Sequence, residues 1–178
     1  MKKNKRLWMR TIILAILLSA VIYTLYGNLV GKDSKQVVQV NDKAPDFILP
    51  KLNGEELKLS EFRGKAVLLN FWGSWCAPCK KEMPVIQDAY DQYKDQNVEV
   101  ITINVNESEL TVKNFFEKNN LSLPVVMDKD SEVYDAYGIY VLPTSFFLHP
   151  DGTVNRVYKG EITRENMSKW MNEILPEQ

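Results

Sequence analysis

Short apolar runs alternate with stretches of helical periodicity from residue 40 to the end of the chain. Runs rich in β-branched and aromatic residues predict strands at 65–72, 98–104 and 145–148, with a short strand or loop at 123–127. Apolar residues at helical spacing predict helices at 80–94, 109–119, 131–137 and 164–175. This order of elements predicts an α/β domain with a central mixed sheet flanked by helices.

Two turn sequences add antiparallel hairpins to this pattern. Asn53-Gly54 follows a short apolar stretch and predicts a hairpin extension at the start of the domain. Asp151-Gly152 turns the preceding strand into an antiparallel partner at 154–158. We therefore expect a sheet with both parallel and antiparallel pairs.

The helix at 109–119 is the clearest case of a helix whose buried residues can be named in advance. Its large apolar residues are Leu110, Phe115 and Phe116, and we expect all three to face the core.

The first 39 residues have a different character. Residues 1–10 carry five basic side chains and no acid, and Thr11 to Val30 contains no charge, which is about the length that spans a bilayer. We expect a cytoplasmic tail at 1–10, a single-pass signal anchor at 11–30, a linker at 31–39 and one domain at 40–178. The basic tail keeps the N-terminus in the cytoplasm and places the domain outside the cell membrane.

Composition supports one globular domain behind this tail. The chain has 178 residues, of which 45% are hydrophobic and 25% are charged, with a net charge of −1. Five of the 22 Lys and Arg residues lie in the tail, so the rest of the chain is acidic. No basic face stands out, which argues against nucleic-acid binding.

The candidate chemistry lies at the junction of the strand 65–72 and the helix that follows it. Cys76 and Cys79, the only cysteines, flank Ala77 and Pro78 at this junction. The unpaired N–H groups and partial positive charge of a helix N-terminus stabilise a thiolate, the nucleophile of disulfide exchange. We expect Cys76 to be exposed and to attack first, and Cys79 to be more buried and to resolve the mixed disulfide. Pro78 fits the first helical turn, where a missing N–H costs little.

Two other interpretations of the pair are weaker. A zinc site needs two further ligands, and the single histidine, His149, lies in a predicted turn. A purely structural disulfide across so short a loop would constrain the unfolded chain little. A redox-active pair is favoured over both.

The motif Phe71-Trp72-x-x-Trp75-Cys76-x-Pro78-Cys79 resembles the active site of the thioredoxin superfamily. Cys-x-Pro-Cys behind an N-terminal anchor resembles the extracytoplasmic thiol-disulfide oxidoreductases of the TlpA/ResA family. The resemblance implies a thioredoxin-like fold and a protein-disulfide reductase that needs no cofactor. It also implies apocytochrome c as substrate, with its Cys-x-x-Cys-His disulfide, and a transmembrane thiol carrier of the CcdA kind as electron donor.

The resemblance assigns roles to further residues. Pro143 takes the place of a cis proline that faces the cysteine pair, and Trp75 should shield Cys76 and contact a partner. Glu82 and Glu107 match acidic positions beside the active site. For Glu82, one interpretation is a solvated acid that complements the helix dipole; the other is a carboxylate that raises the pKa of Cys76 by like-charge repulsion. Glu107 could equally be an ordinary loop carboxylate.

The main departure from the family is Ala77, where some members carry Glu between the cysteines. Because the residues between the cysteines affect the reduction potential of the pair in this superfamily, that potential is less defined here. Two alternative functions stay open: an oxidant that forms disulfides, and a copper-delivery module, because two thiolates suit Cu(I). The chain lacks the Met-x-Cys-x-x-Cys pattern that would favour copper delivery.

Overall fold

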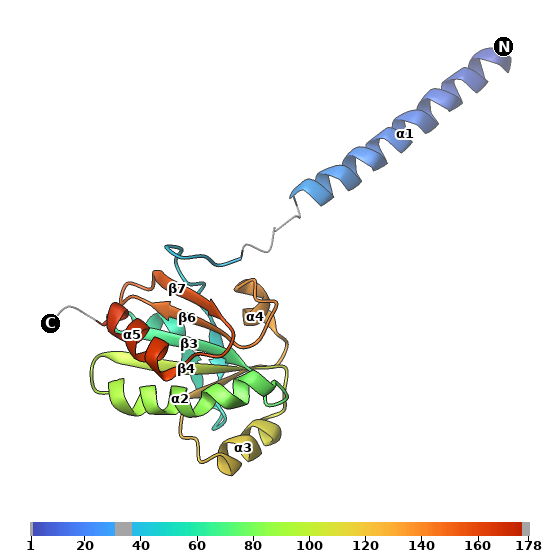
Figure 1. Cartoon of the computed structure of the whole chain (residues 1–178). Helices are drawn as coiled ribbons and strands as arrows, with labels where there is room; N and C mark the ends of the chain where they lie inside the picture. The colour runs from blue at the N-terminus through green and yellow to red at the C-terminus, as the bar shows by residue number, and fades with distance from the viewer. Residues whose placement is uncertain (1, 31–36, 176–178) are drawn as a thin grey trace. The chain divides into compact units, whose positions relative to one another are not determined.

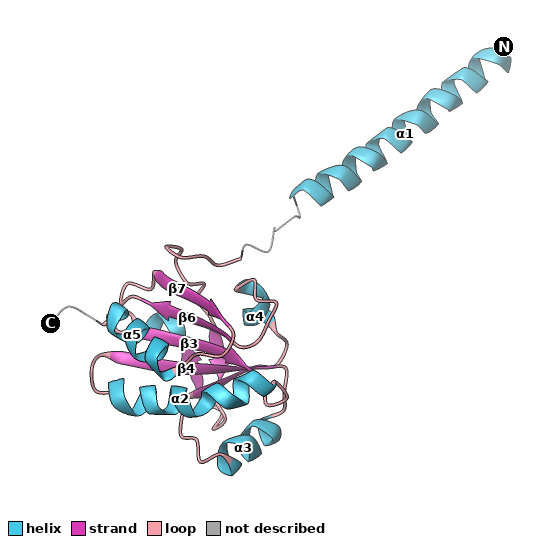
Figure 2. Ribbon diagram, viewed as in Figure 1, coloured by secondary structure: helices cyan, strands magenta, loops and turns pink. Residues whose placement is uncertain are grey.

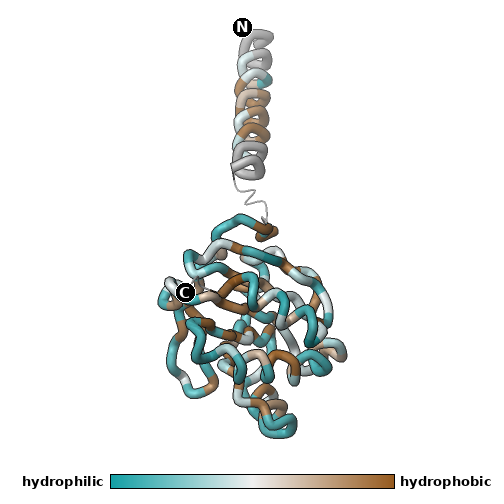
Figure 3. Tube along the Cα trace, turned by 60° about the vertical axis from the view of Figure 1, so that its left-hand side comes forward, coloured by the Kyte–Doolittle hydropathy of each residue, from teal (hydrophilic) through white to brown (hydrophobic). Residues whose placement is uncertain are grey.

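The computed structural model describes residues 2–30 and 37–175, which fall into two compact units, 1–34 and 35–178. Helix α1 (Lys2–Val30) makes up the first unit, and its apolar side chains Ile13, Leu14 and Leu17 are each more than half exposed. The hydropathy colouring of Figure 3 shows the apolar middle of this helix. Within the described residues, no helix combines the length and apolar character needed to cross a membrane.

The signal anchor at 11–30 therefore stays a prediction from the sequence. Most of the expected linker at 31–39 lies outside the described residues.

The second unit contains four α-helices, one 3-10 turn and seven strands among its described residues (Figure 1). In chain order they are β1 (Ile48–Pro50), β2 (Glu56–Lys58), η1 (Leu59–Phe62), β3 (Ala66–Trp72), α2 (Ala77–Tyr93), β4 (Val98–Val105), α3 (Glu109–Lys118), β5 (Val125–Asp128), α4 (Glu132–Ala136), β6 (Thr144–Leu148), β7 (Val154–Lys159) and α5 (Arg164–Ile174).

Five strands form one mixed sheet in the order β5-β4-β3-β6-β7, and β1 and β2 form a separate hairpin (Figure 2). Strand β3 pairs in parallel with β4 and antiparallel with β6, so it lies at the centre of the sheet. All seven of its residues are buried. The mixed sheet, the flanking helices and the hairpin extension were all predicted from the sequence.

Side chains of β3 alternate between two cores, as the period of two in a strand requires. Leu68 and Trp72 belong to the core that α2, α3 and α5 cover, which also contains Cys76 and Cys79. Every second residue of β3 from Val67 to Phe71 belongs to the core on the other face, beneath the β1–β2 hairpin and α4. The cysteines therefore lie on the α2 face of the central strand.

The expectation that Leu110 faces the core is wrong, because its side chain is 67% exposed. In α3 the buried residues are Val112 and Phe116, four positions apart and so on one side of the helix. Leu110 precedes Val112 by two positions, which places it away from that side. Phe115 is partly buried against the same core.

Candidate active site

A four-residue loop joins the central strand to the helix that carries the second cysteine. β3 ends at Trp72 and α2 begins at Ala77, so Cys76 is the N-cap of α2, and its Sγ accepts a hydrogen bond from the Cys79 N–H at 3.3 Å. Pro78 lies in the first turn, as expected. Cys76 and Cys79 form a disulfide with a Cα–Cα distance of 5.3 Å.

The expected exposure of Cys76 is wrong, although the order of the two cysteines is right. Cys76 is 6% exposed and Cys79 is fully buried. As the N-cap, Cys76 turns its side chain back over the first turn of α2, within the apolar core of that face. Trp75 is the exposed residue, at 65%, and its indole lies against Gly73. Shielding of Cys76 by Trp75 stays a prediction.

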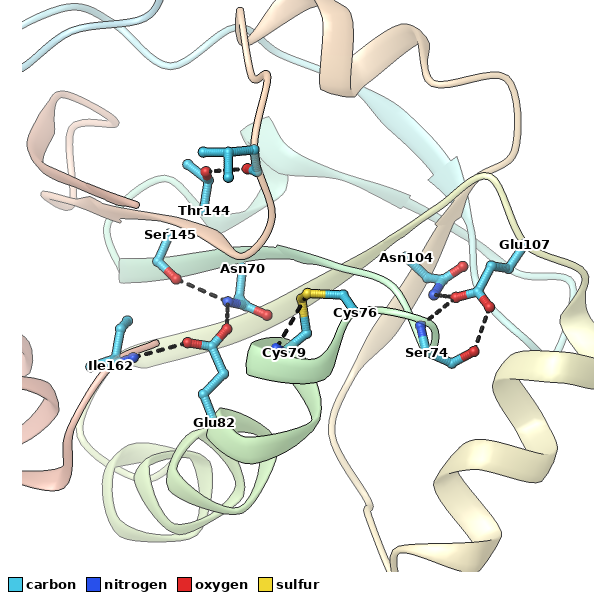
Figure 4. Close-up of a disulfide and its surroundings, with 11 residues drawn as sticks. Asn70, Ser74, Cys76, Cys79, Glu82, Asn104, Glu107, Thr144, Ser145 and Ile162 are labelled. Atoms are coloured by element: carbon cyan, nitrogen blue, oxygen red, sulfur yellow. Dashed lines mark hydrogen bonds between the residues drawn. A yellow bond between two sulfur atoms is a disulfide. The ribbon is translucent and has the colours of Figure 1, made fainter. Parts of the chain in front are cut away.

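Glu107 holds the loop that precedes the cysteines. Its carboxylate accepts hydrogen bonds from the backbone N–H of Ser74 at 2.6 Å, from the Ser74 hydroxyl, and from the Asn104 amide at 2.7 Å (Figure 4). Glu107 therefore lies against the cysteine loop, and its role at the active site stays a prediction. Ser74 and Asn104 were not predicted, because nothing in their spacing from Glu107 indicates the contacts.

Glu82 lies on the buried side of α2, one turn beyond Cys79. It is fully buried, which excludes a solvated acid at the helix surface. Its carboxylate accepts hydrogen bonds from the Asn70 amide at 2.8 Å and from the Ile162 backbone N–H at 3.1 Å. Burial raises the pKa of Glu82 to about 7, against the lowering effect of these two donors. The effect of Glu82 on the pKa of Cys76 stays a prediction.

The peptide bond between Leu142 and Pro143 is cis, as the resemblance implied. In the register of β3 and β6, Phe71 pairs with Thr144. Pro143 therefore lies opposite the end of β3 from which the cysteine loop departs. Just before it, Tyr140 is 70% exposed.

The described residues contain no group of three or more His, Cys, Asp or Glu side chains arranged to hold a metal ion. His149 instead lies near Asn155, with 3.2 Å between its Nε2 and the amide nitrogen, and its backbone closes the turn between β6 and β7. Its predicted position in a turn is confirmed.

Known proteins resemble this chain in sequence and in fold. A model described as the AhpC/TSA family matches residues 40–157. The thiol-disulfide oxidoreductases ResA of Geobacillus thermodenitrificans and Bacillus subtilis are each 43% identical to this chain. These alignments cover 99% of this chain and 100% and 97% of the two relatives. The chain belongs to the ResA-type oxidoreductases of the AhpC/TSA family.

Solved structures agree with this assignment. StoA from Bacillus subtilis matches with a TM-score of 0.63 and 32% identity, over 71% of this chain and 96% of that one. A thiol:disulfide interchange protein from Chlorobium tepidum matches with a TM-score of 0.70 and 25% identity, over 78% and 99%. The fold of this ResA-type chain is thioredoxin-like, and the chain is a thiol-disulfide oxidoreductase.

Proposed function

We propose that this ResA-type reductase acts on the Cys-x-x-Cys-His disulfide of apocytochrome c, before haem is attached. The observation that carries the proposal is the position of Cys76, which caps α2 beside the exposed Trp75 in a chain that aligns with ResA proteins over its full length. The choice of apocytochrome c follows the resemblance to the TlpA/ResA family.

Reduction of the partner takes two exchange steps. The Cys76 thiolate attacks one sulfur of the partner disulfide, whose S–S bond breaks, and the released partner thiolate takes a proton. The Cys79 thiol then gives up its proton and attacks the Cys76 sulfur, which releases the second partner thiol. The partner gains two electrons and two protons, and the chain is left with the Cys76–Cys79 disulfide.

Exposed apolar side chains offer the partner a contact surface. Trp75 and Tyr140 are 65% and 70% exposed, and Val141 is 41% exposed. They belong to the cysteine loop and to the segment before Pro143, which the register of β3 and β6 places at the same end of the sheet. Exposed aromatic residues of this kind are typical of protein-binding surfaces.

Residues 11–30 would tether the reductase to the cell membrane, with the catalytic domain outside. The support is the uncharged sequence, the basic tail and the exposed aliphatic side chains of α1. Electrons would then come from a transmembrane thiol carrier of the CcdA kind. Protease treatment of intact protoplasts tests this topology, because a domain that resists digestion until the cells are lysed contradicts it.

The substrate proposal is tested with the reduced full chain in detergent and oxidised apocytochrome c, by counting free thiols after alkylation. We expect rapid reduction by the reductase and none by Cys76→Ser. A matched apocytochrome in which the haem-attachment His is replaced serves as control. Equal rates with an unrelated Cys-x-x-Cys disulfide would indicate a general reductase and contradict the proposal.

The reduction potential separates reductant from oxidant. A value near the roughly −270 mV of thioredoxin supports a reductant, whereas a value near the roughly −120 mV of DsbA supports the alternative of a disulfide-forming oxidant.

A further inference from the structure

Asn70 is a polar residue in an otherwise apolar row of the central strand. It lies between Leu68 and Trp72 on the face of β3 that packs against α2, and it is fully buried. Cys79 and Glu82, three positions apart on α2, face the same core region. The amide of Asn70 therefore lies in the layer that contains the buried cysteine.

The nitrogen and the oxygen of this amide differ in their hydrogen bonding. Its nitrogen donates to Glu82 at 2.8 Å and to Ser145 at 2.9 Å, which occupies both of its N–H bonds. Its oxygen has no hydrogen-bond partner among the described residues. Because both donors point toward Glu82 and Ser145, the oxygen points the other way, and Figure 4 shows it on the side of the two cysteines.

An unpaired buried oxygen is unfavourable, since it has lost water without gaining a donor. In the disulfide, the sulfur atoms of Cys76 and Cys79 carry no proton that could be donated to it. Reduction adds two electrons and two protons, breaks the S–S bond and forms two S–H groups. Cys79 is fully buried, so its new S–H group forms away from solvent, on the side toward which the unpaired Asn70 oxygen points.

We propose that the Asn70 side-chain oxygen accepts a hydrogen bond from the Cys79 thiol in the reduced protein. Glu82 and Ser145 hold the amide in the orientation that this bond requires. The bond exists only in the dithiol, so it stabilises the reduced form relative to the disulfide. It also keeps Cys79 protonated until the resolving step, while Cys76 at the helix N-terminus is the thiolate.

The S–H stretching band of Cys79 tests the bond directly. In full-chain Cys76→Ser, Cys79 is the only thiol, and hydrogen bonding lowers the wavenumber of its band. We expect the band to move to higher wavenumber in Cys76→Ser/Asn70→Leu, whereas Cys76→Ser/Glu56→Gln, which changes an exposed carboxyl on β2 and keeps the amide, leaves it in place. If Asn70→Leu does not fold, Cys76→Ser alone decides: a band at the position of a thiol dissolved in hydrocarbon overturns the proposal.

The equilibrium of the cysteine pair with glutathione gives a second readout. The measurement is made at about pH 5, below the ordinary thiol pKa of about 8.5, so that effects of Glu82 on a thiolate contribute least. We expect Asn70→Leu to shift the equilibrium about tenfold toward the disulfide, equivalent to about −30 mV. No shift, or a shift toward the dithiol, overturns the proposal. Because neither readout uses apocytochrome c, failure here is distinct from failure of the proposed substrate.

Discussion

Glu82 should make the stability of the protein depend on pH in a defined window. Its pKa rises from 4.5 to about 7 on folding, because the carboxyl is buried. At about 1.4 kcal/mol for each pKa unit, ionising Glu82 in the folded protein costs about 3 kcal/mol. The folded state keeps a proton that the unfolded state loses between about pH 4.5 and 7, so stability falls as the pH rises through this window.

The perturbation is Glu82→Gln, measured by urea unfolding of the oxidised protein at several pH values. The difference in free energy of unfolding between the variant and the unchanged protein should grow by about 3 kcal/mol in favour of the variant from about pH 4.5 to 8. Lost hydrogen bonds to Asn70 or Ile162 add an offset that does not vary with pH in this way. Other titrating groups cancel in the difference.

Glu56→Gln is the matched control, since Glu56 is an exposed carboxyl on β2. Its difference from the unchanged protein should stay flat across the same pH range. A flat difference for Glu82→Gln as well would refute the reasoning, because Glu82 would then ionise as easily in the folded protein as in the unfolded chain.

Three further results are expected. Glu82→Gln should lower the pKa of Cys76 by removing a neighbouring negative charge, and an unchanged thiol titration would contradict this role. Cys76→Ser should abolish reductase activity. Cys79→Ser should accumulate a mixed disulfide with the partner, which mass spectrometry detects. Turnover by either variant would argue against the two-step exchange. Glu107→Gln should destabilise the protein by about 1–2 kcal/mol in urea unfolding, since one carbonyl oxygen replaces a carboxylate that accepts three hydrogen bonds, and Ser74→Ala should cost less.

Local periodicity predicted the elements that depend on neighbours in the chain. The strand expected at 65–72 and the helix expected at 80–94 are β3 and α2, and the disulfide lies at their junction. Glu82 shows where such reasoning ends. The dipole of α2 favours a solvated acid at this position, but its partners Asn70 and Ile162 lie 12 and 80 residues away in sequence. Only the folded chain brings them to the carboxylate.

Chemistry, and not stability, accounts for the buried polar residues Asn70 and Glu82 on the cysteine side of the sheet. Apolar residues at positions 70 and 82 would fill the core between Leu68, Trp72 and α2 without the cost of about 3 kcal/mol that an ionised Glu82 carries. The chain instead has a carboxyl that titrates near neutral pH and an amide oxygen without a partner. Both lie on the face of β3 that holds a cysteine pair whose reaction takes up and releases protons. A buried group that is unfavourable for folding but suited to proton exchange is what a reductase site requires.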